Sequence, residues 1–149
     1  MLHFRKMDIE DLELIYSNDY LRPLLTVAPI GEKFGVLVDE EGAIKGGLTG
    51  YIDEQGAMIQ MIKVPEGSEH DQIKEGLLRA AVYMLDRENI KIIFYKGKID
   101  NIFRFVGFQE SKDISTLPNL EIGKLIIDNI EKGSFSFLEV EKFFDHTCS

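Results

Sequence analysis

The residues with the clearest chemical potential stand in one polar turn, between an apolar run at residues 58–64 and an amphipathic run at residues 73–85. Four side chains of this turn could ligate a divalent cation, because carboxylates and imidazole are suitable ligands: Glu66, Glu69, His70 and Asp71. The plainer interpretation is a helix start, in which Ser68 or Asp71 caps the helix and acidic residues favour its dipole. We expect the helix start and no metal site.

The same turn is also a candidate anion site. An amphipathic helix that begins here leaves its first backbone N–H groups unpaired, and these face whatever lies beyond the preceding strand. The side chains oppose an anion, because acidic residues outnumber Lys74 around the start of the helix. The turn therefore indicates the fold more readily than it indicates the ligand.

Elsewhere the chain offers few candidates for catalysis. His3 and His146 are isolated near the termini, and no nucleophile is paired with either of them in the sequence. Cys148 is the only cysteine, so no internal disulfide can form and the chain is compatible with a reducing cytoplasm. We expect no catalytic role for these three residues.

The composition is that of an acidic globular protein. The chain has 149 residues, 44% hydrophobic and 29% charged, which predicts one domain over residues 1–149. Its formal net charge of -9 argues against nucleic acid as a partner. The sequence has no signal-peptide core and no apolar run of membrane-spanning length, so we expect a cytoplasmic protein without a membrane partner. Frequent Ile, Lys and Glu without Trp are typical of an AT-rich bacterial genome.

The elements that position the turn begin at the N-terminus. Residues 2–5 are typical of a strand, and Asp8 with Asp11 three residues later predicts a capped helix. Residues 20–32 contain two prolines, and this segment could hold a helical turn that covers one mouth of a pocket. A strand and a helix are therefore expected before the central part of the chain.

Three further strands should form an antiparallel meander, because the two turns between them open with Asp and end with Gly: residues 34–38, 43–52 and 57–64. Gly46, Gly47 and Gly50 crowd the middle strand. Missing side chains there allow a bulge or the close approach of another backbone or a ligand.

A strand-helix-strand unit follows the meander. The apolar period of residues 73–85 predicts a helix with one buried stripe, and residues 90–95 form a strand-like run. A strand reached through a crossover helix should pair in parallel with the strand before the helix. Residues 98–106 can then form a short helix ended by Gly107, before a strand candidate at residues 108–114.

The C-terminal part of the chain is expected to be mainly helical. Residues 122–130 have helical spacing, although residues 119–127 could instead form an edge strand. Ser136 with Glu139 is the pattern of a capping box, which predicts a last helix over residues 137–145.

The order of these elements resembles the GNAT superfamily of acyl-CoA-dependent N-acyltransferases. Three stretches carry the resemblance: FRKMDIEDLELI near the start, IKVPEGSEHDQIKEGLLRAA in the middle and IFRFVGF before residue 109. The resemblance covers about residues 2–112 and implies an α/β (α+β) fold with a mixed, mainly antiparallel central sheet flanked by helices. Residues 113–149 would be a C-terminal helical extension, since they do not supply the usual last strand of the family.

The resemblance implies acetyl-CoA or another acyl-CoA as cosubstrate, with no metal. The pantetheine arm would lie against the backbone of Ile62 and Val64, where two strands splay apart. The pyrophosphate would meet the amides near Gln72, Ile73 and Lys74 at the start of the central helix.

The residues depart from the family pattern at several positions. Gln60 stands where members often have a Glu base, and Phe103 where they often have a Tyr acid. Lys96 replaces a common helix asparagine, and Glu69, Gln72 and Lys74 replace the phosphate-loop motif. Tyr51 and Tyr95 lie on strands that would flank the splay, so either could pack in the core, line a pocket or replace the missing acid.

Two functions follow from this sequence. The first is an N-acetyltransferase that transfers an acyl group from acyl-CoA to an amine of a small molecule or peptide. The second is a non-catalytic binding or interaction protein that keeps the GNAT fold and has lost the standard CoA site. Both a monomer and a homodimer remain open, and the catalytic residues are left unassigned.

Overall fold

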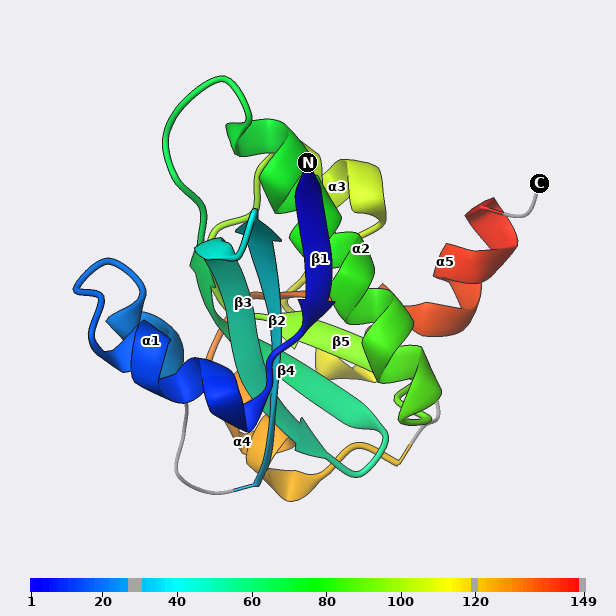
Figure 1. The fold of residues 1–149 in the computed structure, drawn as a ribbon. Helices are drawn as coiled ribbons and strands as arrows, with labels where there is room; N and C mark the ends of the chain where they lie inside the picture. The colour runs from blue at the N-terminus through cyan, green and yellow to red at the C-terminus, as the bar shows by residue number, and fades with distance from the viewer. Residues whose placement is uncertain (27–30, 119–120, 148–149) are drawn as a thin grey trace.

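The computed structural model describes residues 1–26, 31–118 and 121–147 and contains one seven-stranded mixed sheet. Its strands follow the order β1-β2-β3-β4-β5-β7-β6, of which β1 to β5 are labelled in Figure 1. β4 and β5 pair in parallel, and every other neighbouring pair is antiparallel. The expected mixed, mainly antiparallel sheet flanked by helices is confirmed.

The N-terminal elements form as the capping residues predict. β1 (Leu2–Lys6) is followed by η1 (Ile9–Asp11), α1 (Leu12–Tyr16) and η2 (Arg22–Leu25). Asp8 and Asp11 make a reciprocal capping box. Asp11 is buried and also binds the Arg5 guanidinium through two hydrogen bonds of 2.8 Å, which fixes this helical segment to β1. The rest of the expected pocket-covering segment, at residues 27–30, lies outside the described residues.

The meander is also confirmed, with β2 (Glu32–Glu40), β3 (Ala43–Asp53) and β4 (Gly56–Lys63) paired in sequence. The glycines of β3 allow close backbone approach. A Cβ at Gly50 would stand 1.9 Å from the Met58 carbonyl oxygen, and a Cβ at Gly46 would stand 2.3 Å from the Lys63 carbonyl oxygen. No side chain can be accommodated at either distance without movement of the strand.

The central helix α2 (His70–Arg87) connects β4 to β5 (Ile92–Tyr95), and the two strands are parallel as expected. α3 (Asn101–Val106) ends at Gly107, which adopts a positive φ of 130°, and β6 (Gln109–Ser111) follows. Asp100 caps α3 by accepting hydrogen bonds from the amides of Ile102 and Phe103. The short helix therefore starts later than the sequence pattern predicts.

One prediction for the C-terminal part of the chain is wrong. After η3 (Ile114–Thr116) and α4 (Lys124–Ile130), Ser136 and Glu139 do not form a capping box but belong to a strand, β7 (Phe135–Glu139). β7 inserts between β5 and β6, and the last helix, α5 (Val140–Thr147), begins only after it. Residues 113–149 thus supply the last strand, which the sequence analysis did not find there. The pattern missed this strand because β7 is nearly buried on both faces and has no alternation of polar and apolar residues.

Helices cover both faces of the sheet (Figure 1). Val36 and Val38 of β2 pack in the cluster that contains the buried stripe of α2, whereas Leu37 between them packs with Ile15 of α1 and Leu24 of η2. A third cluster joins α4 to the inner part of the sheet near Met58 and Phe94. Within the described ranges, no helix combines the length and the apolar character needed to cross a membrane.

Candidate active site

The candidate active site is the place where β4 and β5 separate. The parallel pairing runs from Gly56 opposite Ile92 to Ile59 opposite Tyr95, and there it ends. β4 continues to Lys63, paired on its other side with β3. Among the described residues, the backbone of residues 61–63 therefore has no strand paired with its other edge, and Ile62 lies on this edge. An extended ligand rich in amides can bind such an edge as a further strand would.

A β-bulge marks the beginning of this separation. In the β3–β4 register, Thr49 pairs with Met61 while Gly50 pairs with Ile59, so Gln60 is the extra residue on β4. The carbonyl of Met58 fits only because residue 50 has no Cβ. The local bend and the separation of β4 from β5 thus occur at the same position along the strand.

Aromatic side chains occupy the base of the separation. Tyr95 stacks on Phe103 with ring centroids 4.7 Å apart, and Phe103 is only 1% exposed. Ile62 and Val64 pack in the same hydrophobic cluster, together with the buried Ile99. The side chains of Ile62 and Val64, the two predicted pantetheine residues, therefore pack in the core, and only their backbone groups are available to a ligand.

The start of α2 lies at the end of β4, but its cap differs from the predicted one. The N-cap residue is Glu69, which makes no side-chain cap hydrogen bond, so neither Ser68 nor Asp71 occupies the N-cap. The Ile73 amide donates to the Glu69 carbonyl at 2.9 Å, and the His70 amide donates to the Gly67 carbonyl at 3.2 Å. Within the described residues, the amides of Asp71 and Gln72 make no backbone hydrogen bond, and they are the N–H groups left for an anion.

Lys74, the third predicted phosphate residue, is held by an ion pair. Its ammonium lies 2.6 Å from the Asp100 carboxylate and 5.3 Å from the centre of the Phe103 ring. Asp100 is partly buried, which opposes its ionisation, but hydrogen bonds from Lys74 and from the Phe103 amide hold the pKa of its carboxyl below the ordinary value. The pair joins the start of α2 to the start of α3, directly beside the separation of β4 and β5.

Two acidic side chains near this helix start, Asp71 and Glu75, each have a basic partner on α2. Asp71 is 80% exposed and contacts the neighbouring His70 imidazole at 3.1 Å. Glu75 accepts a hydrogen bond of 3.0 Å from Arg79, one turn further along α2. The repulsion of an anion by these two carboxylates is therefore weaker than the sequence predicts, because solvent and their basic partners screen them. No group of three or more metal-binding side chains is assembled within residues 1–26, 31–118 and 121–147.

Of the two tyrosines proposed as proton donors, only Tyr95 lies at the separation. The Tyr51 hydroxyl accepts a hydrogen bond from the Asn129 side chain and belongs to the cluster beneath α4. The Tyr95 hydroxyl lies against Gly97, whose missing Cβ would be only 2.3 Å away. Burial, and secondly the Asp100 carboxylate, raise the pKa of Tyr95, so its phenol keeps its proton at neutral pH.

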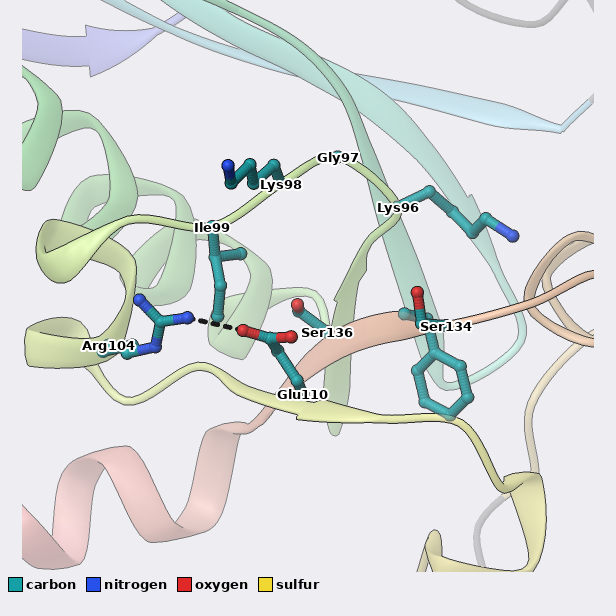
Figure 2. Close-up of a pocket in the computed structure, with 9 residues that line it drawn as sticks. Lys96, Gly97, Lys98, Ile99, Arg104, Glu110, Ser134 and Ser136 are labelled. Atoms are coloured by element: carbon teal, nitrogen blue, oxygen red, sulfur yellow. Dashed lines mark hydrogen bonds and ion pairs between the residues drawn. The ribbon is translucent and has the colours of Figure 1, made fainter.

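A separate cavity of about 350 Å³ lies beyond the end of β5 (Figure 2). The loop at residues 96–99 forms one side of it, α3 and β6 contribute Arg104 and Glu110, and the start of β7 forms the floor. Lys96 extends away from this cavity and donates to the Asn129 carbonyl at 3.1 Å. The sequence pattern did not indicate this cavity, because β7 was interpreted as a helix.

Comparisons with known proteins identify the fold. No protein-family model and no curated protein sequence matches the chain. Solved structures do match. The ribosomal-protein-S18-alanine N-acetyltransferase from Escherichia coli has a TM-score of 0.63 with 12% identity, over 94% of each chain. A GNAT-family acetyltransferase from Staphylococcus aureus has a TM-score of 0.61 with 13% identity, over 94% of this chain and 99% of that one.

A third structure similar to this chain was solved with coenzyme A. It is the PaiA N-acetyltransferase from Thermoplasma acidophilum, with a TM-score of 0.60 and 13% identity, over 93% of this chain and 99% of that one. At these identities the likeness is one of fold. The chain has the fold of the GNAT acyl-CoA N-acyltransferases, as its order of elements predicted.

Proposed function

We propose that this protein is an N-acyltransferase that transfers an acyl group, such as acetyl, from acyl-CoA to an amine. The observation that carries the proposal is the separation of β4 from β5 after Ile59 and Tyr95, with a helix start at the end of β4. This arrangement provides an unpaired strand edge for an amide-containing arm and unpaired amides for its anionic end.

Different backbone groups bind the two parts of the cofactor. The backbone of Ile62, on the open edge of β4, and of Val64, one residue beyond the end of the strand, binds the pantetheine arm. The amides near Gln72 meet the pyrophosphate, together with the helix dipole, while those of Ile73 and Lys74 lie within the helix. The Lys74 ammonium can supply a positive charge there once it leaves Asp100.

The chemical step needs no strong protein base. The neutral amine attacks the thioester carbonyl carbon, the carbon–sulfur bond breaks, and water accepts the proton released by the amine nitrogen. In this proposal Tyr95 protonates the leaving thiolate; its position as the last residue of β5 and its protonated phenol support the role. The acceptor is a small molecule or a peptide that bears a free amine.

Isothermal titration with acetyl-CoA and with CoA tests the proposal. Saturable binding of acetyl-CoA, a thermal shift at the same concentrations and release of CoA in the presence of amines are the expected results. If millimolar acetyl-CoA gives neither heat nor a thermal shift, the proposed function is wrong.

A second function is favoured by the contents of the site. The Tyr95–Phe103 stack and the Lys74–Asp100 pair occupy the space beside the strand separation, as expected for a binding or interaction protein without a CoA site. Native mass spectrometry of the purified protein, together with a sizing column for self-association, discriminates between the two functions. A co-purifying acyl-CoA supports the transferase, whereas another small ligand or a partner protein supports the binding protein.

A further inference from the structure

The hydroxyl of one serine on β7 faces the cavity beyond β5. Ser136 lies on β7 opposite Tyr95 and is only 3% exposed. Its side chain lines the cavity and points into the space between Ile99 and Glu110 (Figure 2). Within the described residues this hydroxyl has no protein hydrogen-bond partner, and since every fully buried side-chain N or O atom there has one, its oxygen is accessible from the cavity. A hydroxyl directed into a cavity is available as a donor to a ligand.

The cavity has a positive balance of charge in a protein that is negative overall. Two cationic side chains, Lys98 and Arg104, line it against one carboxylate, Glu110, while the whole chain carries -9 and the Lys96 ammonium points away. Arg104 binds Glu110 through Nη2 only, at 2.5 Å, so its remaining N–H groups are available. The ion pair with Glu110 orients the Arg104 guanidinium at the cavity, and the other N–H groups of the guanidinium can still donate hydrogen bonds to a ligand.

The apolar side chains and the small volume of the cavity restrict the size and polarity of the ligand. Ile99 and Phe135 are 5% and 3% exposed and supply apolar surface beside the polar groups. A volume of about 350 Å³ is at the small end of the range for ligand sites. The cavity therefore suits a small molecule with one oxyanion group and a short apolar part.

We propose that this cavity binds the carboxylate or phosphate group of a small ligand, through the Arg104 guanidinium and the Ser136 hydroxyl, with Lys98 at the rim. A guanidinium matches the paired oxygens of either group, and a hydroxyl adds a directional hydrogen bond from the floor. The proposal concerns a site separate from the open edge of β4, and it does not require that the protein bind acyl-CoA.

Titrations with inorganic phosphate and with butyrate test this site, followed by the ¹H–¹⁵N NMR signals of Gly97 and Ser136. We expect saturable shifts of both signals at millimolar concentrations of at least one probe. The probe that saturates at the lower concentration identifies the preferred oxyanion. The same titrations are carried out on the Arg104→Gln, Ser136→Ala and Lys112→Gln variants.

Lys112→Gln is the matched control, because it removes one positive charge from an exposed residue that does not line the cavity. We expect Arg104→Gln to weaken binding about tenfold and Ser136→Ala about threefold, and we expect Lys112→Gln to bind like the wild type. The Arg104–Glu110 pair is half exposed, so its loss should leave the fold intact. Absence of saturable shifts with both probes overturns the proposal, as does equal binding by all three variants.

Discussion

The Lys74 ammonium and the Asp100 carboxylate form an ion pair of 2.6 Å that joins the second turn of α2 to the N-cap of α3. Lys74 is 18% exposed and also lies over the Phe103 ring. Each partner has a second role, since Lys74 stands at the proposed phosphate position and Asp100 caps a helix. A bound pyrophosphate would compete with Asp100 for the same ammonium.

The first prediction concerns this competition. Asp100→Asn should tighten CoA binding about three- to tenfold, because it removes a negative charge and releases Lys74 for the phosphate. Asparagine is a good N-cap residue, so α3 should keep its start. Isothermal titration measures the affinity. The control is Glu75→Gln, which breaks the Arg79–Glu75 pair on the same helix and should leave CoA affinity unchanged. Weaker or unchanged CoA binding by Asp100→Asn would contradict this competition.

The second prediction concerns Tyr95. Tyr95→Phe should lower the rate of acyl transfer about 100-fold while CoA affinity changes little, because only the proton donor is lost. The ring should still stack on Phe103, so thermal stability should stay close to that of the wild type. Steady-state kinetics with a saturating amine measures the rate. An unchanged kcat would show that another group or water protonates the thiolate.

The third prediction concerns Asp11 and acid. Hydrogen bonds from Arg5 and from the Asp8 amide outweigh burial and hold the pKa of Asp11 below its ordinary value of 3.8. A carboxyl whose pKa is lower in the folded state stabilises the protein fully above the unfolded pKa, and this contribution is lost as the pH falls through the folded pKa. Asp11→Asn should therefore cost about 2 kcal/mol in the free energy of unfolding at pH 7.

Urea unfolding at pH 7 and at successively lower pH checks this prediction. The difference between wild type and Asp11→Asn should shrink as the pH falls below about 4. Asp19→Asn is the control, because Asp19 is 94% exposed in its pair with Arg22 and should contribute little at any pH. A difference that stays constant with pH would show that the charge of Asp11 is not what stabilises the fold.

The fourth prediction concerns the close approach of β3 and β4. Gly50→Ala should destabilise the protein by about 3 kcal/mol, because its Cβ would meet the Met58 carbonyl oxygen at 1.9 Å. Gly56→Ala, on β4, is the comparison, since its Cβ would first meet the Cδ1 methyl of Ile126 at 3.0 Å, and that side chain can move. Thermal or urea unfolding measures both variants. Equal stability losses would show that the backbone contact at Gly50 can relax.

Local sequence determined much of the fold. The Asp–Gly turns predicted the β2–β4 meander, and the apolar period of α2 predicted the crossover to a parallel β5. These signals were readable because each depends on residues close together in the chain. The interpretation failed at β7, a central strand whose two buried faces remove the alternation that identifies a strand.

The sequence by itself also placed the candidate site, at the junction of β4 and α2, and it indicated that the usual Glu and Tyr positions hold Gln60 and Phe103. Only the tertiary structure decided what occupies that site. Lys74 and Asp100 are 26 residues apart, and Tyr95 meets Phe103 only because α3 folds back over β5. Such contacts depend on how separate elements pack against each other, and no local pattern of residue types encodes that packing.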